Sequence, residues 1–235
     1  YNIKKKINID LDRSSKILSL EKLFIKYRSD KASFWTKKNN GHGYTKFYLK
    51  HLKKIKYKKL NILEIGSYAG ASAAAFSKFF PNSKITCIDI YISNFKYVSK
   101  KINVFGLDAT KIKNVKYFFK MMNITYDTEY FDIIIDDGSH KQDDILYTLN
   151  FFFRSLKPNG FYIIEDYRMM NFFKHLRVSG EPKVDKLIKY INKKKRFNSA
   201  ILDLNFQKEM HKRVKTITYF KGLSKISNIV FFKKN

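Results

Sequence analysis

Short apolar runs alternate with helical stretches from Leu60 onward, and this alternation constrains the fold more than any other feature of the chain. It favours a parallel β-sheet whose strands are joined by crossover helices. A chain of 235 residues is long enough for one such domain with short extensions. We therefore expect a single Rossmann-like α/β unit.

The boundaries of the individual elements follow from the apolar runs and from the turn residues between them. We expect strands at residues 60–65, 84–90, 102–107, 131–135 and 161–164, helices at 71–80 and 143–156, and a turn at 157–160. A helical stretch should then run from 167 to about 210, followed by an antiparallel pair of strands at 215–220 and 229–232. The result is a mostly parallel, seven-stranded sheet with an antiparallel pair of strands at its C-terminal end.

The first part of the chain has a different pattern. Residues 17–27 have helical periodicity, and residues 29–44 form a polar loop that contains glycine. We expect residues 1–58 to form a helical cap over the sheet through which the substrate enters. Residues 59–235 should form the catalytic domain, within one globular unit.

A glycine-containing turn, Glu64-Ile65-Gly66-Ser67-Tyr68-Ala69-Gly70, follows the first predicted strand. Gly66 permits a tight turn, and Gly70 lets the start of the next helix approach a ligand closely. A dinucleotide fingerprint needs a small residue where Tyr68 stands, so the turn argues against NAD. We interpret these residues as cofactor-binding: Glu64, Gly66, Ser67, Tyr68 and Gly70.

Acidic residues close the second and third predicted strands. Ligands of open α/β sheets lie beyond the carboxyl ends of the strands, so these residues should face the site. Asp89 lies about 20 residues after the glycine turn, where a carboxylate can accept both hydroxyls of a ribose. Asp108 is placed to accept the amino group of an adenine, with a surface turn as the alternative interpretation.

The fourth and fifth predicted strands end in paired carboxylates, in the runs Asp136-Asp137-Gly138-Ser139-His140 and Glu165-Asp166-Tyr167. Concentrated negative charge after apolar strands is costly unless a cation neutralises it. We predict Mg²⁺ or a similar divalent cation, for which carboxylate oxygens are suitable ligands. His140 suits a general base, because the ordinary pKa of imidazole is about 6.5.

A purely structural interpretation stays open for the first acidic pair. Asp136 and Asp137 could cap the following helix, with His140 packed in its first turn. That interpretation leaves Glu165 and Asp166 unexplained, so the metal site is favoured.

Three runs of the chain together resemble the mycinamicin and macrocin sugar O-methyltransferases and their bacterial relatives. They are residues 63–70, 135–140 and 162–166, within a similarity that covers roughly residues 30–167. The resemblance implies the Rossmann-like class I methyltransferase fold and S-adenosylmethionine (SAM) as methyl donor. It places the metal on Asp137, Glu165 and Asp166 and the base on His140, and we assign Asp136 to the cofactor.

The segments Ser29-Asp30-Lys31 and Gly41-His42-Gly43-Tyr44 look like the part of that family that lies near SAM and the acceptor. We assign His42, Tyr44 and Tyr167 as candidate substrate residues. The region after Tyr167 matches no family motif. We expect the acceptor to be a small molecule or glycan, with a sugar hydroxyl in a polysaccharide or nucleotide-linked precursor as the general form.

The formal net charge of +28 raises nucleic acid as an alternative partner. The lysines are scattered rather than confined to one stripe, and they accompany abundant Asn, Ile, Phe and Tyr, which favours a compositional origin of the charge. Two alternatives to the sugar O-methyltransferase therefore stay open. They are an RNA ribose methyltransferase and a non-methylating Rossmann-type nucleotide-binding protein.

Cys87 is the only cysteine, so no disulfide can form within the chain and a reducing cytoplasm is expected. No stretch approaches the ~18 consecutive apolar residues of a membrane span. We expect a cytoplasmic protein without a membrane span, and the sequence leaves a homo-oligomer open.

Overall fold

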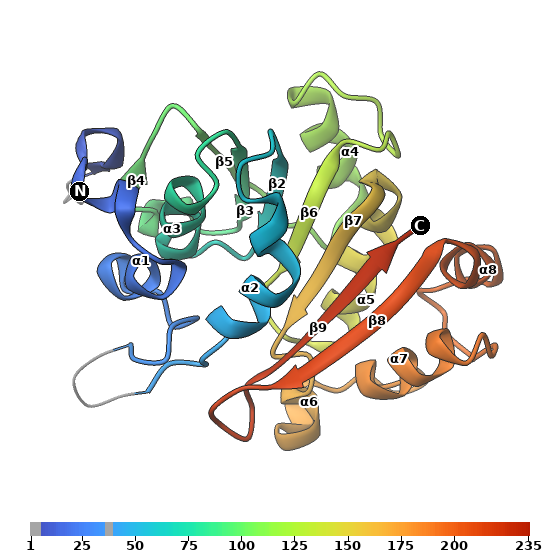
Figure 1. Ribbon diagram of the computed structural model, residues 1–235. Coiled ribbons are helices and arrows are strands. Elements are labelled where there is room, and N and C mark those ends of the chain that lie inside the picture. Colours follow the sequence, from blue (N-terminus) through green and yellow to red (C-terminus); the bar gives the residue numbers. More distant parts are fainter. Residues whose placement is uncertain (1–5, 36–39) are drawn as a thin grey trace.

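A seven-stranded sheet forms the centre of the computed structural model, which describes residues 6–35 and 40–235. Its strand order is β5-β3-β2-β6-β7-β9-β8 (Figure 1). The first five strands in this order are parallel, and β9 is antiparallel to both of its neighbours. The strands are β2 (Asn61–Ile65), β3 (Lys84–Asp89), β5 (Ile102–Gly106), β6 (Phe131–Asp136), β7 (Leu156–Glu165), β8 (Val214–Lys221) and β9 (Asn228–Lys234).

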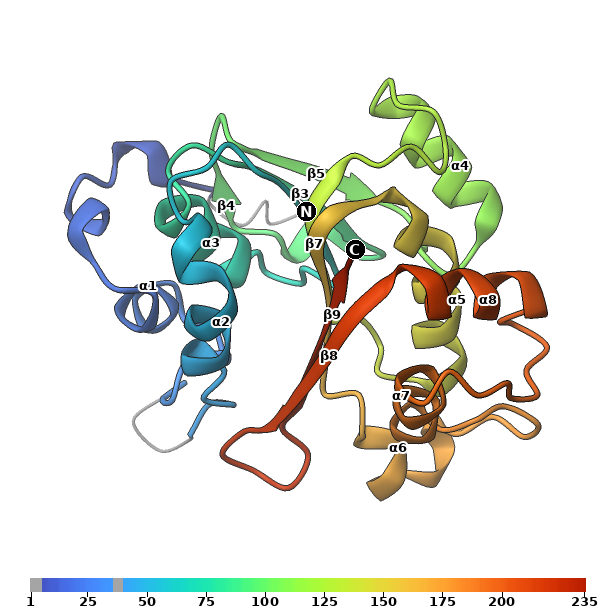
Figure 2. The ribbon, with the colours of Figure 1, turned by 45° about the vertical axis from the view of Figure 1, so that its right-hand side comes forward.

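Helices cover both faces of this sheet (Figure 2). One face packs against α1 (Leu20–Tyr27), α2 (Thr45–Leu52) and α3 (Ala71–Phe79). The other packs against α4 (Ile112–Met121), α5 (Gln142–Phe152), α7 (Val184–Asn192) and α8 (Leu204–Arg213). The central strand β6 is apolar on both faces for this reason, and Ile133, Ile134 and Ile135 are buried. The predicted class I methyltransferase fold is confirmed.

The described part of the N-terminal region contains the helices α1 and α2, and the division of the chain at residue 58 stays a prediction. The Ser19 side chain accepts a hydrogen bond from the Lys22 amide and so caps the start of α1, while Arg28 ends that helix in a left-handed conformation. α1 and α2 share one apolar core with α3 and the sheet. The chain therefore leaves α1 directly over the carboxyl ends of the strands.

Several predicted boundaries were wrong. The continuous helical stretch from 167 to about 210 is instead α6 (Met169–Phe172), α7 and α8, separated by loops. Gly180 with a φ of +83° and Pro182 interrupt the helical periodicity there. The predicted helix 143–156 ends at Phe152, because Leu156 already pairs with Phe131 in the sheet.

Other elements gave no clear signal in the sequence. These are α2, α4 and a small parallel pair formed by β1 (Ile7–Asn8) and β4 (Tyr97–Val98). The predicted turn at 157–160 lies inside β7 as an irregularity, since Leu156 pairs with Phe131 and Phe161 pairs with Ile133. It leaves the direction of the strand unchanged.

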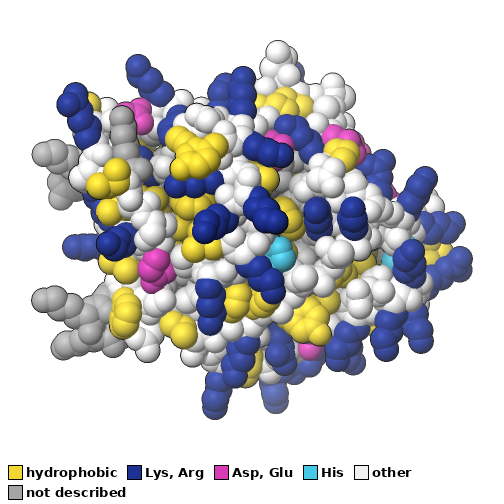
Figure 3. Space-filling model, in the orientation of Figure 1, with side chains coloured by type: hydrophobic (Ala, Val, Ile, Leu, Met, Phe, Trp, Pro, Cys, Tyr) yellow, Lys and Arg dark blue, Asp and Glu magenta, His cyan; other side chains and the backbone are white. Residues whose placement is uncertain are grey.

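The charge is spread over the surface. Lys and Arg side chains are distributed over the face drawn in Figure 3 and do not gather in one patch. Within residues 6–35 and 40–235, no helix is both long and apolar enough to cross a membrane.

The turn after β2 depends on Gly66, which has a φ of +82°. A Cβ atom at this position would lie 2.1 Å from the carbonyl oxygen of Asp137, because the ends of β2 and β6 touch here. The Asp137 amide also donates a hydrogen bond of 2.9 Å to the Ile65 carbonyl. The close approach of these two strand ends therefore requires glycine.

We expect Gly66→Ala to lower the free energy of unfolding by about 1–3 kcal/mol more than Gly180→Ala, the difference being the cost of overpacking. Gly180 is a matched control, since its φ is +83° and no atom lies within 4 Å of an added Cβ. Urea denaturation of both variants measures the difference. Equal losses would show that the contact with Asp137 is unimportant.

Candidate active site

A cavity of about 600 Å³ opens at the carboxyl ends of β2, β3, β5 and β6. Its size lies within the range of small-molecule sites. Five of the eight residues predicted to bind the cofactor line it: Gly66, Tyr68, Asp89, Asp108 and Asp136. The structure does not bring Glu64, Ser67 and Gly70 into the lining, so their predicted contact with the cofactor stays a prediction.

Asp89 organises the rim of this cavity. Its Oδ2 accepts a hydrogen bond of 2.7 Å from the Tyr68 amide, and its Oδ1 accepts one of 2.8 Å from the Tyr91 amide. These contacts fix the carboxylate beside the glycine turn. Each oxygen keeps a lone pair for a ligand hydroxyl.

Asp108 and Asp136 are held in different ways. Asp108 accepts hydrogen bonds from the amide and the hydroxyl of Thr110, so it shapes a turn and also lines the cavity. Asp136 is buried and accepts a hydrogen bond from the Thr148 hydroxyl. Burial raises the pKa of Asp136 to about 6.

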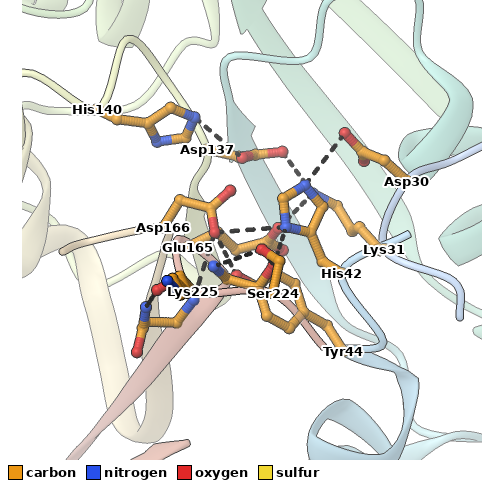
Figure 4. Close-up of polar contacts among 12 residues, drawn as sticks. Asp30, Lys31, His42, Tyr44, Asp137, His140, Glu165, Asp166, Ser224 and Lys225 are labelled. Carbon is orange, nitrogen blue, oxygen red and sulfur yellow. Dashed lines mark hydrogen bonds and ion pairs between the residues drawn. The ribbon is translucent and has the colours of Figure 1, made fainter. Parts of the chain in front are cut away.

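The acidic runs after β6 and β7 meet beside the cavity, and Lys31 reaches between them (Figure 4). The Lys31 Nζ lies 2.5 Å from Asp137 Oδ2 and 2.8 Å from Glu165 Oε2. The Lys31 side chain is only 1% exposed. Burial alone would lower the pKa of Lys31, but Asp137 and Glu165 outweigh it and raise that pKa well above 10.5.

Lys31 was not singled out as a site residue in the sequence. A lysine in a polar loop usually lies in solvent, and only its place in the Ser29-Asp30-Lys31 segment set it apart. Tyr48 was missed for a similar reason. Its hydroxyl donates to Glu165 Oε1, although its position in α2 resembles that of an ordinary core aromatic residue.

Glu64 lies beneath this cluster, and neither of its carboxylate oxygens accepts a hydrogen bond from residues 6–35 or 40–235. Its Oε1 is 4.0 Å from the Lys31 ammonium. Burial raises the pKa of Glu64 to about 7. The Lys31 ammonium therefore lies close to three carboxylates at once. Its single positive charge cannot neutralise the negative charges of all three.

Two of the predicted substrate residues, Tyr44 and His42, lie against the Asp166 carboxylate. Its Oδ1 accepts a hydrogen bond from the Tyr44 hydroxyl and lies 3.5 Å from His42 Nδ1. His42 Nε2 lies 3.7 Å from Asp30. Burial lowers the pKa of His42, but Asp30 and Asp166 outweigh it and raise that pKa to about 9, so His42 carries a positive charge at neutral pH.

His140 stands on the opposite side of the cluster. Its backbone φ is +59°, and its Nε2 lies 3.9 Å from Asp137 Oδ1. One ligand atom from each of Asp137, His140 and Asp166 can be chosen so that all lie within 4.8 Å of one another. The structure thus brings His140 together with two of the three predicted metal ligands, while both oxygens of Glu165 are engaged by Lys31 and Tyr48.

Tyr167 is separated from His42 and Tyr44. It is buried and lines a second cavity, between α7 and the end of β8. The three predicted substrate residues therefore do not share one wall.

We expect Lys31→Met to lower the free energy of unfolding by about 3–5 kcal/mol, because it leaves buried carboxylates without their cation. Adding Glu165→Gln should recover part of the loss, since the glutamine removes one of the orphaned charges. Chemical denaturation measures both variants.

Lys234→Met is the matched control. The Lys234 side chain is also 1% exposed, but its ammonium lies 3.0 Å from a single carboxylate, that of Glu129, which is 38% exposed. A loss in Lys31→Met no larger than in Lys234→Met, with no recovery by Glu165→Gln, would contradict the role of Lys31.

Comparison with known proteins identifies proteins of similar sequence and fold. Residues 63–167 match a family described as a methyltransferase domain. The chain is 30% identical over 156 residues to L-olivosyl-oleandolide 3-O-methyltransferase of Streptomyces antibioticus, an alignment that covers 63% of this chain and 36% of the relative. It is 26% identical over 138 residues to mycinamicin VI 2''-O-methyltransferase of Micromonospora griseorubida, covering 53% and 31%. The chain thus spans about a third of the length of these curated relatives.

Among solved structures, the chain is similar to the MycE methyltransferase from the mycinamycin biosynthetic pathway in complex with Mg, S-adenosylhomocysteine (SAH) and mycinamycin VI. The TM-score is 0.70 at 20% identity, and the match covers 94% of this chain and 55% of MycE. The resemblance predicted from the motifs is confirmed. The chain has the class I methyltransferase fold, its residues 63–167 match a methyltransferase domain, and it resembles the sugar O-methyltransferases.

Proposed function

We propose that the protein is a SAM-dependent O-methyltransferase that uses a divalent cation and acts on a hydroxyl of a sugar or a related small molecule. The observation that carries this proposal is the convergence of Asp137, Asp166 and His140 beside a cavity rimmed by Asp89. The names of the relatives, which describe 3-O- and 2''-O-methyltransferases, support it.

The larger cavity fits SAM in size and in chemistry. Gly66 lines it, and Asp89 presents two fixed carboxylate oxygens at its rim, which suit the two hydroxyls of a ribose. When bound, SAM supplies an activated methyl group on a positively charged sulfur. Asp136 and Asp137 lie on the side of the cavity nearest the acidic cluster, where their negative charge favours a cationic ligand.

The acidic cluster fits a divalent cation. The carboxylates of Asp30, Glu64, Asp137, Glu165 and Asp166 outnumber the two described cationic side chains that they face, Lys31 and His42. A divalent ion would add positive charge where these side chains supply too little. Asp137 Oδ1 and Asp166 Oδ2 accept no hydrogen bond from the described residues, and with Glu165 they are the oxygens we assign to the metal.

The roles of the side chains follow from this geometry. A divalent cation bound here would supply Lewis acidity, which lowers the pKa of an acceptor hydroxyl. His140, whose side chain is 20% exposed beside Asp137, would accept the proton of that hydroxyl. Lys31, Tyr44 and Tyr48 hold the carboxylates in place, so the site needs little rearrangement when the acceptor binds.

Calorimetric titration with SAM and SAH tests the cofactor. We expect Asp89→Asn to weaken SAH binding by about tenfold or more, because a charged hydrogen-bond acceptor is lost at the ribose. Asp10→Asn is the matched control, since Asp10 also accepts a backbone amide hydrogen bond but lies outside the cavity. Absence of SAM and SAH binding to the unaltered protein would contradict the proposed function, and tight binding of NAD instead would favour the non-methylating alternative.

Production of SAH from SAM with a panel of sugar acceptors tests the base. We expect His140→Ala to lower the rate of methyl transfer by about 10²–10⁴-fold, while the SAH dissociation constant stays within about twofold. His175→Ala, which changes an exposed histidine outside both cavities, should leave the rate unaltered. Excess chelator should abolish the activity of all three proteins. Lost SAH affinity with an unaltered rate in His140→Ala would exclude His140 as the base.

A further inference from the structure

The second cavity, with a volume of about 370 Å³, lies on the α7 side of the sheet. Its walls come from the residues that follow β7, from α7, and from the adjoining ends of β8 and β9. This volume is large enough for a small ligand or for one part of a larger ligand. None of the motifs in the sequence accounts for it.

The second cavity adjoins the candidate active site through Asp166. Tyr167, the next residue in the chain, forms one wall, and Asn228 forms another. The backbone amide of Asn228 donates a hydrogen bond of 3.4 Å to Asp166 Oδ1. A ligand in this cavity therefore lies next to the backbone that positions a predicted metal ligand.

The wall of this cavity is positively charged. Arg168, Lys189 and Lys221 come from three separate parts of the chain, and their side chains make no hydrogen bond or ion pair with any residue of the segments 6–35 and 40–235. The lining contains a single carboxylate, Asp185, which accepts hydrogen bonds from Asn171 and from the Lys186 amide. Cations left unpaired around a hollow suit a phosphate group, to which both arginine and lysine donate.

An aromatic side chain completes this cavity. Tyr219 lines it and is 64% exposed, so one face of its ring is open to a ligand. Such a ring can stack against a sugar or a nucleobase. The combination of unpaired cations and an open ring is expected for a site that binds a phosphate ester of a sugar.

We propose that the second cavity binds the phosphate-bearing part of the acceptor, so that the substrate is a phosphorylated or nucleotide-linked sugar. This inference rests on the proposed function. Tyr167 then contributes to acceptor binding through the second cavity, while His42 and Tyr44 act on the other side of Asp166.

Because the chain has a net charge of +28, lysines also line cavities that are distant from the candidate active site in function. One such cavity provides a control. Lys116 and Lys120 of α4 line a cavity of about 360 Å³ that contains no residue of the candidate active site. Replacing them removes the same charge as replacing Lys189 and Lys221. A comparison of the two double variants separates a built site from general electrostatic attraction.

The test is calorimetric titration of the SAH-saturated protein with UDP-glucose, glucose 1-phosphate and methyl glucoside. We expect both phosphate esters to bind and methyl glucoside to bind at least tenfold more weakly. Lys189→Ala/Lys221→Ala should weaken binding of the esters at least tenfold, and Lys116→Ala/Lys120→Ala should leave it within twofold. A preference for UDP-glucose over glucose 1-phosphate would identify the nucleotide-linked sugar as the substrate class, and the reverse would identify the sugar phosphate.

Three outcomes would overturn the proposal. They are equal losses in the two double variants, methyl glucoside binding as tightly as the esters, and a short RNA binding more tightly than UDP-glucose in a way that depends on Lys189 and Lys221. The SAH titration is independent of these outcomes. If SAH binds and the esters do not, the second cavity has been misassigned, whereas failure of SAH to bind contradicts the proposed function itself.

Discussion

The ammonium group of Lys31 is the contact on which the rest of the candidate active site depends. It comes from the loop between α1 and α2 and joins Asp137, after β6, to Glu165, at the end of β7. Removing charges from water costs several kcal/mol per ion, and only well-placed partners offset that cost. Because removing one partner of a buried ion pair leaves an uncompensated charge, the loop that carries Lys31 cannot leave the strand ends without exposing unpaired charges there.

The same pairing explains why the cluster still has room for a metal ion. Lys31 and Tyr48 take up both oxygens of Glu165, whereas Asp137 and Asp166 each keep an oxygen directed away from them. Burial raises the pKa of Glu64 to about 7, and the attraction of Lys31 offsets only part of that rise. An added cation would therefore be attracted to Asp137 and Asp166, which lie near His140, and Asp137 also lines the larger cavity.

Much of this layout could be predicted from the sequence, for a physical reason. Parallel strands place their carboxyl ends at one edge, so the polar residues after β2, β3, β6 and β7 had to converge once the strands were identified. Lys31 could not be predicted this way, because its burial depends on a loop that crosses the sheet edge and has no periodicity of its own. The failed prediction of one long helix after Tyr167 has a related cause, since each short amphipathic segment there is helical and only tertiary packing separates them.

The order of the strands arranges the proposed chemistry along one edge of the sheet. The ends of β5, β3, β2 and β6 border the larger cavity, the ends of β6 and β7 carry the acidic cluster, and β7, β9 and β8 border the cation-lined cavity. Because β9 is antiparallel to β7, it begins where β7 ends, which places Asn228 against Asp166. The antiparallel strand pair therefore extends the ligand-binding edge beyond the parallel strands. The part of the chain without family motifs therefore forms most of the wall of the cavity that we propose binds the acceptor.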